Sequence, residues 1–334
     1  MKATAIAHPN IALVKYWGKR DEALILPHQS SLSVTLAPLS VTTSVEFSAG
    51  SEAAGDQVEL NGKVAQGSER ARVVALVAEV RREAAQGAGR PLGPAKVVSH
   101  GNFPMAAGLA SSAAGFAALA LAARAAAGLP RELRAESRLA RRGSGSACRS
   151  IQGGFCAWLR GERADGEDSC AEQLFPEAHW PELRLLVAVV SAEEKEVKSR
   201  DGMKNTVETS PYYPAWVRDA EAELGNARRL IADRDLNGLG ALAERNAWRM
   251  HATALAADPP LCYLKPATLA LIQALPHARK DGVPVYFTLD AGPNPVLLTE
   301  ARHVDAVKAL ALEKGAREVV LCEPGGDARV TLDA

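Results

Sequence analysis

The sequence has no excess of either charge, since its 334 residues contain 39 lysines and arginines against 39 aspartates and glutamates. A protein that binds nucleic acid or an anionic membrane through its overall charge would be expected to show a basic excess. The balance therefore argues against both kinds of partner. Any anion that this chain binds must be held by the local placement of a few cations.

The sequence also lacks a cysteine framework. Its five cysteines are odd in number, scattered, and never spaced as C-x-x-C pairs, which argues against a disulfide scaffold and a zinc site. The histidines show no metal-ligand spacing, and we expect them to be structural or on the surface. Cys148 has no histidine near it in the sequence, so we interpret it as a small core residue and not a nucleophile. This cysteine usage is typical of a reducing compartment and predicts a cytoplasmic protein.

Long hydrophobic runs are almost absent. The one long run, from Met105 to Leu129, is mostly alanine and glycine and contains Arg124. Alanine is too weakly hydrophobic to drive membrane insertion, so we predict no transmembrane helix. The first ten residues contain no apolar core of a secretory signal. The nucleotide-binding patterns G-x-G-x-x-G and G-x-x-x-x-G-K-[ST] are missing as well.

Strand and helix patterns occur together along the chain, which predicts an α+β protein. The dipeptide Asn61-Gly62 predicts a hairpin turn. Strands are predicted at 3–8, 32–47, 95–100, 155–159, 184–190, 283–289, 295–299 and 317–322. Helices are predicted at 68–86, 131–141, 204–232, 235–253, 266–280 and 302–314, and in the alanine-rich stretch that ends near Gly128. Residues 161–183 and 193–202 are predicted to be irregular. We place a domain boundary near residue 184, which divides the chain into 1–183 and 184–334.

The run NFPMAAGLASSAAG, from Asn102 to Gly115, leads through small residues into the alanine-rich helix. A loop of this kind exposes backbone N–H groups, and the helix dipole adds partial positive charge at the same place. Ser111 and Ser112 can cap the helix and also offer hydroxyl groups. The pattern is typical of a phosphate-binding loop. Taken alone, it fits a well-capped core helix equally well.

A cationic cluster follows the first predicted strand. Lys15, Lys19 and Arg20 lie within six residues around Gly18, together with Tyr16. Such a cluster can surround an anion. The alternative is a solvated strand end, because most runs of charge in proteins face water.

Three further segments could contribute to a site. Arg149 follows Ser144 and Ser146 on a second loop of small residues, where a planar guanidinium suits bidentate contact with a carboxylate or phosphate. A turn with a surface arginine is the alternative. The segment 193–202 resembles a mobile basic loop, which would more often be simply solvated. Asp290 ends an apolar strand before Ala-Gly-Pro, where it could act as a general base, although capping and turn aspartates are commoner there.

Together these motifs resemble the mevalonate diphosphate decarboxylase family of the GHMP superfamily of small-molecule kinases. The matching stretches keep the family's order and span nearly the whole chain: NIALVKYWGKRD (10–21), SSLSVTL (30–36), NFPMAAGLASS (102–112), RGSGSACRS (142–150), WPEL (180–183), SRDGM (199–203), HAT (251–253) and FTLDAGPN (287–294). The runs around Arg149 and Asp290 are specific to the decarboxylase branch. The chain departs from the family pattern at Gln29, usually asparagine, and at Met105, usually threonine.

The resemblance implies a GHMP-kinase-like fold with two lobes, a ribosomal-S5-domain-2-like N-terminal lobe and a ferredoxin-like C-terminal lobe, and a deep cleft between them. It implies that the enzyme uses ATP and Mg²⁺ to convert mevalonate 5-diphosphate to isopentenyl diphosphate in isoprenoid biosynthesis, by 3-phosphorylation and then decarboxylation. It also implies a homodimer. Three alternatives stay open: a decarboxylase of mevalonate 5-phosphate, a 3-hydroxyl kinase that stops before decarboxylation, and a non-catalytic relative that only binds nucleotide or metabolite.

The resemblance also assigns roles to individual residues. Asp290 would orient or deprotonate the 3-hydroxyl, Arg149 would hold the C1 carboxylate, and Lys15 would stabilise the ionised form of Asp290. The residues that would bind the substrate are Asn10, Tyr16, Lys19, Ser144, Ser146, Arg149, Ser199, Arg200 and Met203. Those that would bind ATP are Asn102, Ala106, Gly108, Leu109, Ala110, Ser111, Ser112 and Lys195. Mg²⁺ would be held through the ATP phosphates, with Ser112 as the candidate for direct contact.

Overall fold

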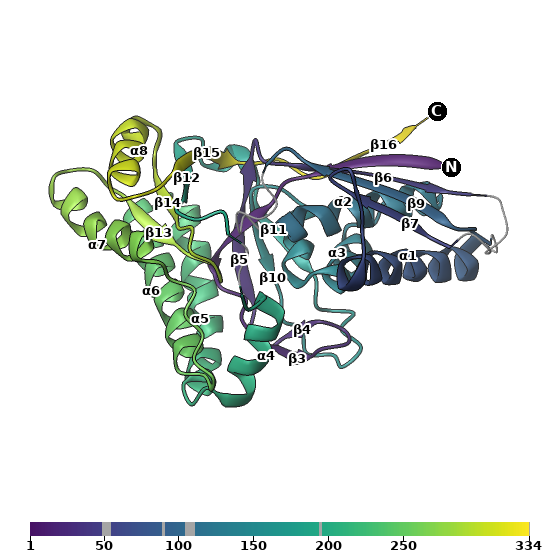
Figure 1. Cartoon of the computed structure of the whole chain (residues 1–334), viewed down its shortest axis with the longest axis horizontal. Helices are drawn as coiled ribbons and strands as arrows, with labels where there is room; N and C mark the ends of the chain where they lie inside the picture. The colour runs from purple at the N-terminus through teal and green to yellow at the C-terminus, as the bar shows by residue number, and fades with distance from the viewer. Residues whose placement is uncertain (49–54, 89–90, 104–110, 194–195, 334) are drawn as a thin grey trace.

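The computed structural model describes residues 1–48, 55–88, 91–103, 111–193 and 196–333. Helices and strands are mixed along the whole length, which confirms the predicted α+β class (Figure 1). Among these residues, no helix combines the length and the hydrophobicity that crossing a bilayer requires.

The first sheet has six strands in the order β16-β1-β6-β9-β7-β8. Their bounds are Lys2–Ala7 for β1, Val41–Phe47 for β6, Gln57–Leu60 for β7, Lys63–Val64 for β8, Ala95–Gly101 for β9 and Arg329–Asp333 for β16. One face is covered by three helices: α1 (Gly67–Ala88), α2 (Ser111–Ala126) and α3 (Leu133–Gly143) (Figure 1). Helix α2 contacts β1, β6, α1 and α3. Its alanines are small enough to let neighbours approach from several sides, which explains its composition.

The second sheet has the order β11-β10-β5-β15-β12-β14-β13, with β2 beside β5. Its strands are β2 (Asn10–Val14), β5 (Ser31–Ala37), β10 (Phe155–Trp158), β11 (Ala171–Phe175), β12 (Leu183–Val189), β13 (Tyr286–Thr288), β14 (Val296–Glu300) and β15 (Glu318–Pro324). Alternate residues of β12 belong to different cores. Leu185 and Val187 pack with α5 (Tyr213–Ala232) and α6 (Leu236–Leu255), whereas Leu186 packs with α7 (Pro266–Lys280) and α8 (Val304–Glu313). Burial on both faces explains why β12 is almost continuously apolar.

Both sheets combine strands from the two ends of the chain. In the second sheet, Ala37 of β5 pairs with Glu323 of β15. In the first, β16 pairs with β1, so the two termini lie at the same side of the molecule (Figure 1). The division into 1–183 and 184–334 stays a prediction, as do the two named lobes and the cleft between them.

The structure corrects several predicted elements. The strand expected at 32–47 is two strands, β5 and β6. The irregular stretch 161–183 contains β11 and the 3₁₀ helix η3 (Glu177–His179), and the loop around Arg149 is the 3₁₀ helix η2 (Gly145–Ser150). The expected helix 204–232 is α4 (Ser199–Thr209) followed by α5. The break between these helices comes just before Pro211, whose ring disfavours a helical residue ahead of it.

Besides β11, four further short strands were not predicted: β2, β3 (Lys19–Asp21), β4 (Leu26–Pro27) and β16. The charged residues in β3 hid its extended conformation, because strand patterns are recognised from alternating hydrophobicity. The hairpin formed by β3 and β4 lies with α4 between the two groups of helices (Figure 1).

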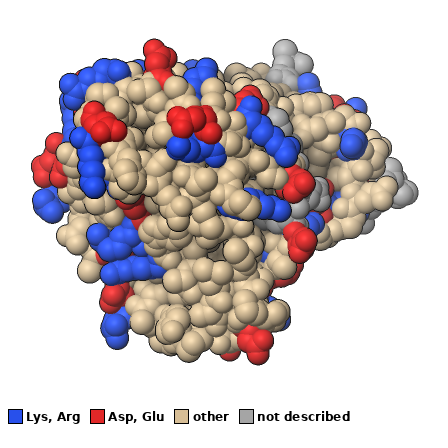
Figure 2. All heavy atoms as spheres, turned by 60° about the vertical axis from the view of Figure 1, so that its left-hand side comes forward, with Lys and Arg blue, Asp and Glu red and all other residues tan. Residues whose placement is uncertain are grey.

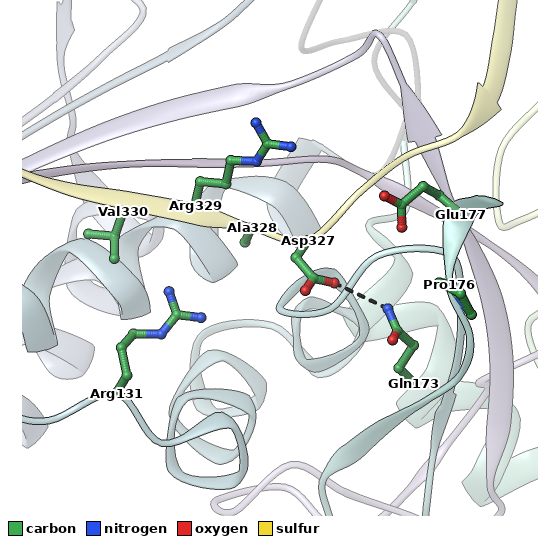
Figure 3. Close-up of a pocket in the computed structure, with 8 residues that line it drawn as sticks. All are labelled: Arg131, Gln173, Pro176, Glu177, Asp327, Ala328, Arg329 and Val330. Atoms are coloured by element: carbon green, nitrogen blue, oxygen red, sulfur yellow. Dashed lines mark hydrogen bonds between the residues drawn. The ribbon is translucent and has the colours of Figure 1, made fainter.

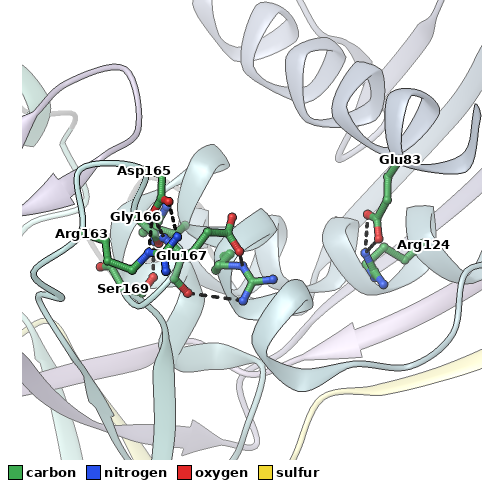
Figure 4. Close-up of polar contacts among 9 residues, drawn as sticks. Glu83, Arg124, Arg163, Asp165, Gly166, Glu167 and Ser169 are labelled. Atoms are coloured by element: carbon green, nitrogen blue, oxygen red, sulfur yellow. Dashed lines mark hydrogen bonds and ion pairs between the residues drawn. The ribbon is translucent and has the colours of Figure 1, made fainter. Parts of the chain in front are cut away.

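Buried arginines hold several of these elements together. Glu83 of α1 and Arg124 of α2 face each other in an ion pair that ties the two helices (Figure 4). The same view shows the 163–169 loop, in which Arg163 pairs with Asp165. The guanidinium of Arg141, near the end of α3, donates to the carbonyls of Gly166 at 2.9 Å and of Ser169. Arg141 therefore anchors this loop to the end of α3, shortly before Ser144 in the sequence.

On the face formed by the helices of the second half, lysines and arginines are interspersed with aspartates and glutamates (Figure 2). Exposed pairs such as Arg229 with Asp233, at 3.8 Å, contribute little to stability. This face shows no large patch of a single sign, in keeping with the balanced composition.

Candidate active site

The site begins where β2 ends, at Lys15. A register shift between Ala12 and Val14 interrupts the pairing of β2 with β5, and irregularities of this kind re-aim side chains. The Lys15 side chain is only 1% exposed, and its Nζ donates to the Ala12 carbonyl at 2.8 Å and to Asp290 Oδ1 at 2.6 Å. Burial lowers the pKa of Lys15, whereas the Asp290 carboxylate opposes this by favouring the charged amine.

Asp290 lies just beyond the end of β13. Thr288, the last residue of that strand, donates from its hydroxyl to the Ala12 carbonyl at 2.8 Å, so β13 and β2 are joined next to the ion pair. The Asp290 side chain remains 38% exposed. Its carboxylate is therefore anchored by Lys15 and still accessible from outside, which is the arrangement that a general base requires.

Arg149 is held in the interior by neutral groups. It lies on η2 and is 2% exposed. Its guanidinium donates to Ser31 Oγ at 2.6 Å, to Ser33 Oγ at 2.9 Å and to Asn10 Oδ1 at 3.2 Å. Asn10 is itself oriented, because its Nδ2 donates to Ser150 Oγ at 2.7 Å. The predicted alternative, a turn with a surface arginine, is wrong.

The environment of Arg149 suits an incoming anion. Within the described part of the chain, no carboxylate lies at ion-pair distance from its guanidinium. Burial is the main cause that lowers the pKa of Arg149, and the Cys148 and Asp290 groups oppose it. A buried cation that has only neutral partners costs folding free energy. A carboxylate or phosphate bound beside Arg149 would supply the missing counter-charge.

Tyr16 contributes a second unsatisfied group. Its Oη is buried and has no hydrogen-bond partner among the described residues. The ring packs edge-on against Trp158 at a centroid distance of 4.6 Å, and both rings crowd Gly145, where an added Cβ would come within 2.8 Å of Tyr16. Glycine is therefore required at this position. A buried hydroxyl without a partner costs about 1–3 kcal/mol, and a ligand oxygen could satisfy it.

The start of α2 meets the end of α3 beside these residues. Ser112 Oγ lies 3.3 Å from Ser144 Oγ. Ser146, two residues on, accepts a hydrogen bond at its carbonyl from Asn10 Nδ2 at 3.1 Å. Ser144 and Ser146 are both half-buried. The proposed phosphate-binding segment and the Arg149 segment are thus brought together, although 32 residues separate the two contacting serines.

Helix α4 and the β3 strand complete the cluster. Ser199 and Arg200 open α4, and Arg200 is one of the charges that act on the phenol of Tyr16. Lys19 is buried and its Nζ pairs with Glu22 Oε2 at 2.5 Å. Since Lys15 is buried as well, the alternative of a solvated strand end is wrong for these two lysines, whereas Arg20 is exposed.

Comparison with known proteins places the chain in a family. Residues 7–171 match a family model described as the diphosphomevalonate decarboxylase-like N-terminal domain, and residues 185–316 match the mevalonate 5-diphosphate decarboxylase C-terminal domain. The chain belongs to the diphosphomevalonate decarboxylase family. The human diphosphomevalonate decarboxylase is 42% identical over 307 residues, which cover 89% of this chain and 76% of the human protein.

Solved structures of this decarboxylase family share the fold. Mevalonate diphosphate decarboxylase from Staphylococcus aureus superposes with a TM-score of 0.91 at 36% identity, covering 99% of this chain and 98% of that one. MDDEF in complex with MVAPP, AMPPCP and magnesium gives a TM-score of 0.90 at 41% identity, with 99% of both chains covered. The predicted family and the α+β fold class are confirmed.

Some residues that the family resemblance assigned to ATP lie outside the described ranges: Ala106, Gly108, Leu109, Ala110 and Lys195. The Asn102 side chain is described and serves the backbone, because its amide accepts from Ser40 N at 2.8 Å and donates to the Pro38 carbonyl at 2.9 Å. Its predicted contact with ATP stays a prediction.

Sequence reasoning overlooked several residues of this decarboxylase site. His251 was expected to be structural or on the surface; it is 2% exposed, and it lies near enough to Lys15 and Asp290 for their charges to affect it, which the sequence did not indicate. Ser31 and Ser33 were recognised only as part of a matching run. Two serines at alternate positions of a buried strand share one face, and that spacing was the available signal. The thiol of Cys148 is fully buried and its pKa is raised to about 12, which fits the predicted core role.

His251 should make the stability of the fold pH-dependent. Burial lowers its pKa to about 4 from the ordinary 6.5, so between these values the unfolded chain binds a proton that the folded chain excludes. The stabilisation is therefore complete above pH 6.5 and is lost as the pH falls toward 4, by up to about 3 kcal/mol.

Urea unfolding from pH 7.5 to 4.5 measures this loss of unfolding free energy. His251→Gln should flatten the profile, and the exposed-site control His277→Gln should not; equal profiles for His251→Gln and wild type would contradict this reading.

The structure also contains a pocket of about 500 Å³ (Figure 3). Its lining residues come from the segment just before α3, from β11 and the residues that follow it, and from the start of β16 with the residues just before it: Arg131, Gln173, Pro176, Glu177, Asp327, Ala328, Arg329 and Val330. None of the predicted site residues lines it. The candidate active site is therefore defined by the Lys15–Asp290 pair and Arg149.

Proposed function

We propose that this protein catalyses the ATP-dependent decarboxylation of mevalonate 5-diphosphate to isopentenyl diphosphate, with ADP, phosphate and carbon dioxide as the other products. The observation that carries the proposal is the buried Arg149 guanidinium, surrounded by neutral partners and placed near the Lys15–Asp290 pair. Membership of the decarboxylase family supports the same reaction.

The chemistry divides between these residues. The 3-hydroxyl of the substrate is a poor leaving group, and phosphorylation converts it to a good one. Asp290 orients this hydroxyl and accepts its proton as the oxygen attacks the γ-phosphorus of ATP. Lys15 holds the Asp290 carboxylate in place. Departure of phosphate then builds positive charge at C3, and the electrons of the breaking C1–C2 bond form the alkene. Arg149 binds the C1 carboxylate bidentately and sets its orientation.

The diphosphate tail of the substrate extends from Arg149 toward α4. Tyr16 Oη, which is buried without a partner among the described residues, supplies one hydrogen bond. Ser144 and Ser146 offer hydroxyls, and Ser199 and Arg200 lie at the N-terminus of α4, where the helix dipole favours an anion. The other two predicted contacts are Met203, on the next turn, and Lys19. Lys19 would share its charge between Glu22 and the phosphates.

ATP binds at the N-terminus of α2, where Ser111 and Ser112 begin the helix. Magnesium neutralises phosphate charge in phosphoryl transfer, and MDDEF is a relative that binds MVAPP, AMPPCP and magnesium together. In the described part of the chain, no three His, Cys, Asp or Glu side chains gather into a metal site. Magnesium would be held through the ATP phosphates, with Ser112 as the candidate side-chain contact.

The proposal also covers the oligomeric state, the cellular location and the division into domains. The protein works as a homodimer, as the family resemblance implies, and sizing by light scattering tests this. It acts in the cytoplasm, in keeping with five cysteines that are all unpaired. Residues 1–183 form the ATP-binding unit and 184–334 the unit that carries Asp290.

The deciding experiment supplies the purified protein with ATP, Mg²⁺ and mevalonate 5-diphosphate, and follows ADP and carbon dioxide together. Equal amounts of both are expected. ADP without carbon dioxide would instead identify a 3-hydroxyl kinase. If neither substrate is turned over, the protein is a binding protein. A parallel assay with mevalonate 5-phosphate tests the monophosphate alternative; we expect lower kcat/KM, because the contacts of Arg200 and Tyr16 with the terminal phosphate would be lost.

A further inference from the structure

The backbone of Lys15 is held from outside its own sheet. Lys15 follows directly after β2, at the point where pairing with β5 has ended. Its backbone N–H donates to Asn246 Oδ1 at 2.8 Å, across 231 residues of sequence. Asn246 lies on α6 and is fully buried. A buried side chain thus takes the place that a neighbouring strand would occupy.

The Asn246 amide is itself fixed by a carboxylate. Its Nδ2 donates to Glu223 Oε2 on α5, and Glu223 is 6% exposed. The other oxygen, Oε1, accepts from Arg249 at 2.8 Å and from Arg245 at 3.2 Å. An ionised carboxylate can only accept hydrogen bonds. Glu223 therefore requires the NH₂ group of Asn246 on its own side, which leaves the amide oxygen to face Lys15.

We infer that Glu223 and Asn246 are positioning residues that set the place of Lys15 and, through it, the place of the Asp290 carboxylate. The inference rests on the proposed roles of Lys15 and Asp290. Lys15 Nζ reaches Asp290 Oδ1 at 2.6 Å while its side chain turns back to the Ala12 carbonyl at 2.8 Å. Because the Lys15 amine is hydrogen-bonded to its own chain at Ala12, a shift of the Lys15 backbone also moves the amine. Small errors in placing a reacting group are costly for catalysis.

The competing explanation is that the network only fastens α5 to α6. Both helices contribute to one hydrophobic core through residues such as Ile231 and Leu239, so packing already holds them together. A purely structural network would affect the melting temperature but not the properties of Lys15. The two explanations therefore differ in kcat and in the reactivity of the Lys15 amine.

The test is a set of substitutions in the full-length protein. Asn246→Ala should lower kcat about tenfold or more, with the KM for ATP changed less than about twofold. Asn246→Asp alone places a second carboxylate against that of Glu223 and should lower kcat further than Asn246→Ala does. Combining it with Glu223→Gln exchanges the donor and the acceptor, so that the new carboxylate still accepts from Lys15 N–H. This double variant should recover kcat to within about threefold of wild type, which a double-mutant cycle measures directly.

Glu244→Gln is the matched control. Glu244 is also on α6 and pairs with Arg279 at 2.9 Å, but it does not contact Lys15. Its substitution should lower the melting temperature and leave kcat within about twofold. Wild-type kcat in Asn246→Ala, or a folded double variant that does not recover, would overturn the inference.

A second readout does not depend on activity. Lys15 is almost inaccessible, so its labelling by an amine-reactive reagent, followed by mass spectrometry, should be slow in wild type and in Glu244→Gln. It should be several-fold faster in Asn246→Ala; equal labelling of Asn246→Ala and wild type would overturn the inference in any case. If wild type releases no carbon dioxide but the labelling rates differ as expected, the proposed function fails while the positioning of Lys15 stands.

Discussion

Replacing Asp290 with asparagine should leave substrate binding close to wild type and lower kcat by about 10³-fold. The amide keeps the shape of the carboxylate but cannot accept the proton of the 3-hydroxyl, and general bases contribute about 10²- to 10⁴-fold to rates. The change also removes the charge that Lys15 contacts at 2.6 Å. Single-turnover measurement of ADP and carbon dioxide, with binding of mevalonate 5-diphosphate followed by calorimetry, separates the chemical step from affinity.

Asp281→Asn provides the control for this substitution. Asp281 is exposed and is the C-cap residue that follows α7, so the same chemical change there should alter neither kcat nor binding. A near-normal kcat for Asp290→Asn would remove the general base from the mechanism. A loss of substrate binding with unchanged kcat would make Asp290 a binding residue.

Substituting Arg149 with lysine should reduce kcat by about 10²-fold and change the KM for ATP by less than about twofold. Lysine keeps the charge but cannot reproduce the planar fork that donates to Ser31, Ser33 and Asn10 at once. The C1 carboxylate would then be bound in variable orientations, and misplacement of about 1 Å can cost 10²-fold in rate. Steady-state assays that vary each substrate separately measure both effects.

Arg142→Lys is the matched control, because Arg142 lies in the same stretch of chain but is exposed and pairs only weakly with Glu79, at 3.5 Å. It should behave as wild type. If Arg149→Lys raised only the KM for ATP, the arginine would belong to the nucleotide site. Arg149→Met tests the cost of the buried charge: we expect it to retain or exceed the wild-type melting temperature while releasing no carbon dioxide.

The proposed reaction explains why such a costly arrangement is retained. Arg149 is buried without a counter-ion among the described residues, and Tyr16 Oη lacks a hydrogen-bond partner there. Both features destabilise the free protein. Each is relieved when an anionic substrate binds, so the binding free energy is concentrated at the carboxylate and the diphosphate. Unpaired polar groups of this kind also discriminate strongly against analogues that lack the matching group.

The sequence by itself determined many of the local elements and the family. The period of Val73, Val77 and Val80 predicts the buried face of α1, and Asn61-Gly62 predicts the β7–β8 turn. Motif order was sufficient to identify a decarboxylase of the GHMP superfamily. These features depend on residues a few positions apart, for which backbone geometry links pattern to structure.

Only the tertiary structure decided the environments of the reactive groups. Whether Lys15 was solvated or buried, and whether Arg149 lay on a surface turn, could not be read from neighbouring residues. Lys15 meets Asp290 across 275 positions, and Arg149 meets Ser33 across 116. Asn246 and Glu223 gave no local signal, because a polar residue on an amphipathic helix normally faces water. Their roles arise from contacts between distant segments, which hydrophobic periodicity does not encode.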